Sequence, residues 1–141
     1  MISAEEFIPN PVNLLESNRS LGYSIEEAVS DLIDNSISAN SKNISFHILR
    51  KNLSPKFILL DDGNGMSLEN GELVNSFKLA SMNPLDKRES NDLGRFGFGL
   101  KTASLSQSRS FIVITKRKNK ELISRALDLD FIKKKNKWIL R

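Results

Sequence analysis

The segment DLIDN, Asp31 to Asn35, places a carboxylate and an amide four residues apart. On a helix, Asp31 and Asn35 would share one face. The amide oxygen of Asn35 suits magnesium, a hard cation that takes few protein ligands and otherwise prefers phosphate and water oxygens. The carboxylate of Asp31 could orient or deprotonate an attacking water. Taken alone, the pair is weak evidence, because acidic and amide residues on an exposed helix face are usually just solvated.

A glycine turn, Asp61 to Met66, reads DDGNGM and follows a predicted strand directly. Its two glycines, Gly63 and Gly65, permit positive φ angles and let a ligand approach the backbone closely. Asp61, at the strand end, could accept a hydrogen bond from an exocyclic amine. The alternative is a plain turn, because Asp-Gly and Asn-Gly pairs are common turn formers.

A second glycine-rich stretch, from Gly94 to Thr102, reads GRFGFGLKT and opens a predicted helix. Such a loop presents free backbone N–H groups and the positive end of a helix dipole to phosphate. Lys101 adds a point charge for the terminal phosphates. The spacing G-x-x-G-x-G is not the dinucleotide fingerprint, and one residue separates Gly99 from Lys101 where a Walker loop allows none. Neither a Rossmann site nor a P-loop is predicted.

The elements that position these motifs follow from the spacing of apolar residues. A helix is expected at about Ser24 to Ser38, where Ser24 and Glu27 fit a capping box. Ser67 is expected to cap a short helix. The other expected elements are strands at 44–49, 56–60, 111–115 and 122–127, a hairpin turn at 118–120, and helices around 73–80 and 100–107. This order of helices and hairpins predicts an α+β sandwich.

The segment Ser81 to Asp92 contains almost nothing apolar except Met82 and Leu85. Such a segment cannot pack, and we expect a mobile surface loop. Its position between two motifs suggests a lid.

Length and composition limit the possible classes of protein. The 141 residues, 39% hydrophobic and 27% charged, are expected to form one soluble domain. No apolar stretch approaches the ~20 residues of a membrane span, and the first ten residues lack a signal-peptide core, so a cytoplasmic location without a membrane partner is expected. The absence of cysteine excludes disulfides, and one histidine cannot build a multi-histidine zinc site. Because residues 137–141 resemble the beginning of a strand, the chain is expected to be a fragment of a longer protein.

The net charge of +4 comes from the C-terminal segment. Residues 116–141 hold 10 of the 21 basic side chains and 3 of the 17 acidic ones. Such a segment could contact nucleic acid or another acidic partner. The alternative is a solvated hairpin turn and a solvated loop.

Taken in order, the three motifs resemble the signature of the GHKL superfamily, the ATPase group of gyrase, heat-shock chaperones, histidine kinases and MutL. That signature is an acid and an asparagine on one helix, D-x-G-x-G after a strand, and G-x-x-G-x-G before a helix. The match covers roughly Gly22 to Gln107, and DLIDNS, DDGNGMS and GRFGFGLKTAS most resemble the MORC-like and MutL-like branch. The resemblance implies a Bergerat ATP-binding fold over residues 1–141: a two-layer α/β sandwich with a mixed, mostly antiparallel sheet and helices on one face.

The resemblance also implies ATP and Mg²⁺ as ligands, with a role for each motif residue. Asp31 would be the catalytic residue, Asn35 would bind the magnesium, and Asp61 would bond the adenine amine. The segment Ser81 to Asp92 takes the place of the family's ATP lid, whose closure is commonly coupled to dimerisation, so a homodimer on ATP binding is expected. The other residues implied to bind the nucleotide are Gly63, Gly65, Met66, Gly94, Gly97, Gly99, Leu100, Lys101 and Thr102.

Asp31 departs from the pattern of the hydrolysing members, in which the general base is usually glutamate. Aspartate is shorter by one methylene, roughly 1.5 Å of reach, and proton transfer depends steeply on distance. We therefore predict magnesium-dependent ATP binding with slow hydrolysis as a conformational switch. The alternative is a module that binds ATP without splitting it and gates contact with a partner or nucleic acid. Asp34 is a rival candidate for the base, but it lies one residue before Asn35 and would point about 100° away from Asn35 around the helix axis. A histidine-kinase role is disfavoured because His47 lies in a predicted strand.

Overall fold

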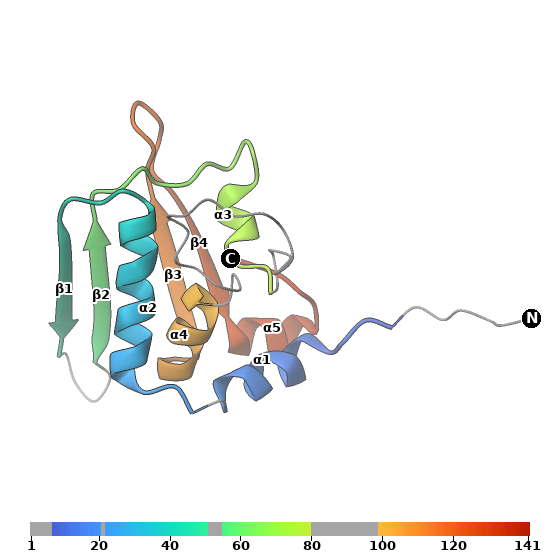
Figure 1. Cartoon of the computed structure of the whole chain (residues 1–141). Helices are drawn as coiled ribbons and strands as arrows, with labels where there is room; N and C mark the ends of the chain where they lie inside the picture. Colours follow the sequence, from blue (N-terminus) through green and yellow to red (C-terminus); the bar gives the residue numbers. More distant parts are fainter. Residues whose placement is uncertain (1–6, 21, 51–54, 80–98) are drawn as a thin grey trace, which may run out of the picture.

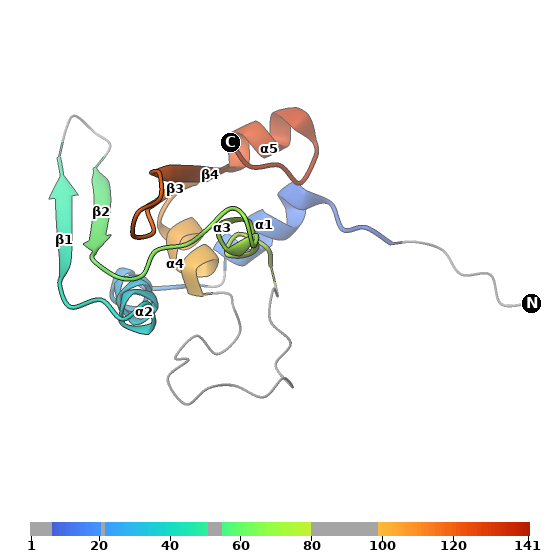
Figure 2. The same ribbon diagram turned by 90° about the horizontal axis from the view of Figure 1, so that it is seen from above.

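The computed structural model describes residues 7–20, 22–50, 55–79 and 99–141. Helices α1, α2 and α4 lie together on one side of strands β3 and β4 (Figures 1 and 2). Helices and antiparallel strands thus combine in the predicted α+β fold. The elements are α1 (Pro11–Arg19), α2 (Ile25–Ser38), β1 (Ile44–Leu49), β2 (Lys56–Asp61), α3 (Glu72–Asn75), α4 (Gly99–Gln107), β3 (Ser110–Thr115), β4 (Ile123–Asp128) and α5 (Leu129–Lys135).

The described strands form two antiparallel hairpins. In the first, β1 pairs with β2 from Ile44↔Asp61 to Leu49↔Lys56. In the second, β3 pairs with β4 from Ser110↔Asp128 to Thr115↔Ile123. The turn of the second hairpin lies where predicted, with a hydrogen bond from the Lys120 N–H to the Arg117 carbonyl (3.0 Å). The first hairpin ends at Asp61, and the glycine turn that follows lies against the end of α2.

Helix α2 begins as its sequence predicts. The Ser24 hydroxyl accepts from the Glu27 N–H (3.1 Å), and the Glu27 carboxylate accepts from the Ser24 N–H (2.8 Å). This reciprocal capping box satisfies two N–H groups that the helix cannot pair internally. Ala28, which is buried, lies on the face that packs toward α4. The helix therefore presents Asp31 and Asn35 from a firmly capped start.

Two helices were missed by the sequence reasoning. In α1, the side chain of Asn10 caps the N–H groups of Val12 and Asn13. In α5, Asp128 caps the Phe131 N–H, and Ile132 is buried. This burial stabilises the helix even though three lysines follow Ile132. The alternative of a solvated loop is therefore wrong for Lys133 to Lys135, which lie in α5. Three lysines in the last turn of α5 are favourable, because they face the negative end of the helix dipole.

Two further predictions need correction. Helix α3 has only four residues, and Ser67 does not cap a helix but accepts a hydrogen bond from the Glu69 N–H in a turn. Residues 137–141 form no strand, although Arg141 exchanges two backbone hydrogen bonds with Ala126 on β4 (2.8 and 2.9 Å). Arg141 thus forms one reciprocal backbone pair with β4.

The core of the described residues joins α1, α3, α4, α5 and β4. Phe77 stacks on Phe111 of β3 with ring centroids 5.3 Å apart. The β1–β2 hairpin lies outside this core, and its Phe46 and Ile48 remain exposed. None of the described helices is long and apolar enough to cross a membrane. The core cluster consists of Leu15, Leu73, Phe77, Leu105, Leu127, Leu129 and Ile132.

Candidate nucleotide site

Asp31 on α2 lies against the first residue of α4. A Cβ atom placed on Gly99 would be 3.5 Å from Oδ2 of Asp31. At the other end, the Gln107 side chain of α4 donates to the carbonyl of Tyr23, just before α2 (3.1 Å). The two helices therefore run antiparallel, and the carboxylate lies beside the positive end of α4. This contact brings the first motif and the second glycine-rich stretch together.

The carboxylate of Asp31 has a second neighbour that the sequence reasoning missed. The phenol of Tyr23 donates a hydrogen bond to Oδ2 of Asp31. This hydrogen bond, helped by partial burial and by the negative charge of Asp31, raises the pKa of Tyr23 to about 12. The phenol therefore stays protonated, and a donor, across the physiological pH range. No sequence spacing identifies the pair, because Tyr23 lies outside α2.

Asp61, at the end of β2, is tied to the other end of α2. Its carboxylate accepts hydrogen bonds from the hydroxyls of Ser36 (3.3 Å) and Ser41 (3.2 Å) and from the Gly63 N–H (2.9 Å). Ser36 is the neighbour of Asn35 and is only 3% exposed. The first and second motifs therefore meet here. A carboxylate offers about four acceptor positions, so Asp61, which is exposed, keeps capacity for a further donor.

The two glycines of the turn are required by close backbone approaches. A Cβ on Gly63 would lie 2.8 Å from the Ala39 carbonyl oxygen, and the Asn64 N–H donates to that same oxygen (2.9 Å). Gly65 has a φ of +66°, and a Cβ there would lie 2.8 Å from the carbonyl carbon of Lys116. The turn is thus held between the end of α2 and the end of β3.

Asp62 and Met66 hold the turn in place on either side. Asp62 accepts from the N–H groups of Lys42 (2.7 Å) and Asn43 (2.9 Å) and from the Asn43 side chain (2.7 Å). These bonds, those of Asn43 first, lower the pKa of Asp62 to about 2. The Met66 N–H donates to the Thr115 hydroxyl (2.9 Å), and the Met66 side chain packs against the core. Asp62 is a structural residue of the turn that the sequence reasoning did not identify.

The remaining predicted residues are placed less uniformly. Asn35 is exposed one turn after Asp31, Leu100 is half-buried, and Thr102 is buried in α4. Gly94 and Gly97, like the whole predicted lid, fall in residues 80–98, outside the described residues. Their contacts with phosphate stay a prediction.

Lys101 does not lie on the Asp31 side of α4. Two residues after Gly99, its side chain leaves the helix about 200° around the axis. It is 2% exposed, and its ammonium donates to the Ser76 carbonyl at the end of α3 (2.9 Å). Burial lowers the pKa of Lys101 to about 8. The predicted phosphate contact of Lys101 stays a prediction, while its observed partner is a backbone carbonyl.

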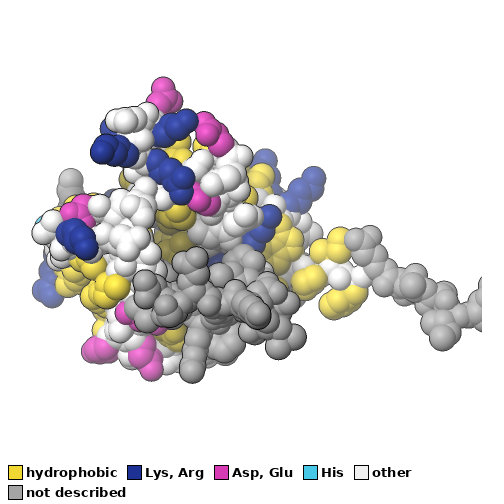
Figure 3. Space-filling view, turned by 45° about the horizontal axis from the view of Figure 1, so that its top comes forward, with side chains coloured by type: hydrophobic (Ala, Val, Ile, Leu, Met, Phe, Trp, Pro, Cys, Tyr) yellow, Lys and Arg dark blue, Asp and Glu magenta, His cyan; other side chains and the backbone are white. Residues whose placement is uncertain are grey.

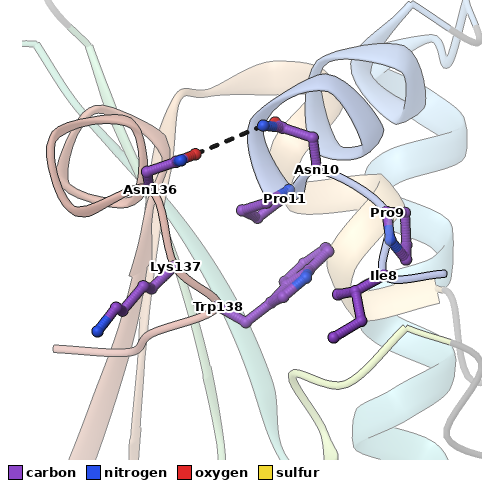
Figure 4. Close-up of a pocket in the computed structure, with 7 residues that line it drawn as sticks. All are labelled: Ile8, Pro9, Asn10, Pro11, Asn136, Lys137 and Trp138. Atoms are coloured by element: carbon purple, nitrogen blue, oxygen red, sulfur yellow. Dashed lines mark hydrogen bonds between the residues drawn. The ribbon is translucent and has the colours of Figure 1, made fainter. Parts of the chain in front are cut away.

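A hollow of about 390 Å³ lies away from these motifs, between the residues before α1 and those after α5 (Figure 4). The ring of Trp138 points toward Pro9 and Pro11 across it, and Asn10 bonds Asn136 at its edge (3.4 Å). None of the predicted nucleotide-binding residues lines this hollow. It is therefore not the candidate site.

The basic side chains of the β3–β4 turn gather at one end of the molecule, with acidic side chains close to them (Figure 3). Arg117 pairs with Glu72 (2.7 Å), and Lys120 pairs with Glu69 (3.2 Å). Part of the positive charge is thus neutralised within the chain. In the part of the chain that the structure describes, no three acidic or histidine side chains form a metal cluster.

The comparisons with known proteins agree with this geometry. The family model for histidine kinase-, DNA gyrase B-, and HSP90-like ATPases matches residues 23–141. ATPase MORC2 of Homo sapiens is 32% identical over 109 residues, which cover 74% of this chain and 10% of that protein. ATPase morc-1 of Caenorhabditis elegans is 27% identical over 106 residues, which cover 75% of this chain and 12% of that protein. The chain thus spans about a tenth of the length of these relatives. With the family match extending over most of its residues, this chain belongs to the histidine kinase-, DNA gyrase B- and HSP90-like (GHKL) ATPases, near their MORC branch.

Proposed function

We propose that this chain binds ATP with magnesium, hydrolyses it slowly and acts as a nucleotide-controlled switch. The observation that carries this proposal is the convergence on α2 of Gly99 beside Asp31 and of Asp61 beside Ser36. Residues of the second and third motifs thereby lie against α2, the helix that carries the first motif. The family match and the relatives named as ATPases support the same function.

Each part of the nucleotide has a partner in this arrangement. Asp61, held as a carboxylate acceptor by three donors, would accept from the exocyclic amine of adenine. The exposed amide oxygen of Asn35 would hold the magnesium, whose other ligands would be phosphate and water oxygens. The backbone N–H groups at the start of α4, with Gly99, would bind the phosphates. When bound, magnesium would neutralise charge on the phosphates.

Asp31 would act as the general base. Its carboxylate, beside Gly99, would take a proton from the water that attacks the γ-phosphorus. Its short side chain makes hydrolysis slow. Closure of the segment 81–92 over the nucleotide, with formation of a homodimer, would be the switch, and hydrolysis would reset it.

Calorimetric titration of the folded chain with ATP and magnesium tests the binding. We expect saturable binding with ATP and binding weaker by about 10-fold to 100-fold with GTP, because the oxygen that replaces the adenine amine would face the Asp61 carboxylate unpaired. Magnesium chelation is expected to weaken the binding of ATP. Folded protein that takes up no ATP at millimolar concentration would refute the proposal.

The alternative, an ATP-binding module without hydrolysis that gates contact with a partner or nucleic acid, is favoured by one observation. Oδ2 of Asp31 already accepts the Tyr23 hydrogen bond, and the side chain is short. Phosphate release distinguishes the two functions. Release that disappears in Asp31→Asn but persists in Asp34→Asn, the matched change on the same helix, would reject the non-hydrolysing function.

A further inference from the structure

Tyr23 is fixed at both ends by contacts with the candidate site. Its backbone carbonyl accepts from the Gln107 side chain at the end of α4 (3.1 Å), and its phenol reaches Oδ2 of Asp31. Asp31 in turn lies against Gly99 at the start of α4. Tyr23 thus contacts the end of α4 directly, through Gln107, and the start of α4 indirectly, through the Asp31 carboxylate.

This double attachment restricts the Asp31 carboxylate. A phenol bond to Oδ2 selects one rotation of the carboxyl group and leaves the carboxylate with free lone pairs that can accept from a water. An aspartate side chain is shorter than a glutamate side chain, so it has less freedom to correct a wrong rotation of its carboxyl group. A wrong rotation therefore lowers the rate of proton transfer more strongly. Tyr23 therefore fixes the orientation of a carboxyl group whose distance to the attacking water is critical.

We propose that Tyr23 is a positioning residue for Asp31: the phenol holds Oδ2 beside Gly99 and thereby fixes the rotation of the carboxyl group that receives a proton from the water attacking the γ-phosphorus. This inference rests on the proposed ATP hydrolysis. The raised pKa of Tyr23 supports it, because a phenol that stays protonated remains a donor to the carboxylate. No other tyrosine in the chain can replace it, since Tyr23 is the only one.

The proton accounting assigns Tyr23 no transfer of its own. One O–H bond of the water breaks, and its proton moves to the Asp31 carboxylate. The water oxygen bonds to the γ-phosphorus while the bond from that phosphorus to the bridging oxygen breaks, which releases ADP and phosphate. Tyr23 keeps its proton throughout, and only its hydrogen bond to Oδ2 orients the acceptor.

Tyr23→Phe tests this role, because it keeps the ring and removes only the hydroxyl. We expect the ATP dissociation constant and KM to stay within about twofold of wild type, while kcat falls on the order of 10-fold to 100-fold. Asp31→Asn is expected to reduce phosphate release to background. In that background, adding Tyr23→Phe is expected to change nothing further, because a residue that acts only through Asp31 has no effect once the base is gone.

Three results would overturn the inference. One is wild-type kcat in folded Tyr23→Phe, and another is a Tyr23→Phe effect of equal size with and without Asp31. The third is wild-type protein that binds ATP but releases no phosphate above the Asp31→Asn rate, which would remove the base role of Asp31 as well. Absence of ATP binding by the folded wild type would instead refute the proposed function itself.

If Tyr23→Phe does not fold, Gln107→Ala provides the second variant. It removes the exposed side-chain bond to the Tyr23 carbonyl and a second bond to the hydroxyl of the neighbouring Ser106. A fall in kcat of a few fold is expected in the wild-type background and none with Asp31→Asn. An unchanged kcat in folded Gln107→Ala, or an equal fall in both backgrounds, would count against the positioning role.

Discussion

Replacing Asp31 with alanine is expected to lower the pKa of Tyr23 from about 12 toward 10, because it removes both the hydrogen-bond acceptor and its negative charge. Burial and Glu27 remain and hold the pKa of the variant above 10. At pH 10.5, about 3% of the tyrosine is ionised with a pKa of 12, and about 25% to 75% with a pKa between 11 and 10. Absorbance near the tyrosinate band reads this fraction directly, because the chain has a single tyrosine.

The same bond makes stability depend on pH at the alkaline end. Between pH 10 and 12 the folded protein binds more protons than the unfolded chain. The stabilising contribution is therefore fully present below pH 10 and is lost as the pH rises through 12. Asp34→Ala, the neighbouring change on α2, is the control and is expected to titrate like wild type. Circular dichroism at pH 10.5 confirms that each variant is folded, and identical titrations of wild type and Asp31→Ala would refute the hydrogen bond.

Three further predictions concern the turn and the buried lysine. Gly65→Ala is expected to destabilise the fold by about 2 to 4 kcal/mol, because its φ is +66° and a Cβ would meet the Lys116 carbonyl. Gly71→Ala, with a φ of +76° but only an ordinary contact with the Asn75 side chain, is expected to cost about 1 kcal/mol. Chemical denaturation measures both, and equal costs would contradict the close approach at Gly65. The wild type is expected to gain stability from pH 8 to 10.5, because the buried ammonium of Lys101 loses its proton more readily than it does in the unfolded chain. Lys101→Met is expected to remove this gain, and an unchanged pH dependence of stability would argue against the burial of Lys101. Asp62→Ala is expected to remove stability that is present above pH 4 and lost as the pH falls toward 2, and acid titration of both proteins measures the difference; superimposable acid curves would contradict the depressed pKa.

Much of the fold was predictable because local signals determine it. The capping box at Ser24 and the apolar spacing behind it place α2, and the alternation in β1 and β3 places the hairpins. Helix α5 was not predictable in this way. Its run of lysines has the composition of a loop, and only burial of Leu129 and Ile132 against other elements makes it a helix.

The motifs of the candidate site could be found from residue types and order. Asp31, Asn35 and Asp61 stand out because acids and amides at those spacings suit magnesium and nucleotide chemistry. The contacts that join the motifs could not be found, since Ser36 and Asp61 are 25 residues apart and meet only when the first hairpin returns to α2. Lys101 shows the limit of motif reasoning, because its direction depends on the rotation of α4 in the packed core.

The sequence by itself determined the family, the helix that carries the acid and the amide, and the two glycine turns, because each is written in neighbouring residues. The tertiary structure alone decided that Tyr23 bonds Asp31, that Asp61 bonds α2, and that Lys101 is buried. These outcomes depend on the antiparallel packing of α2 on α4 and on the position of the first hairpin. Such arrangements follow from the burial of many side chains together, and no local spacing encodes them.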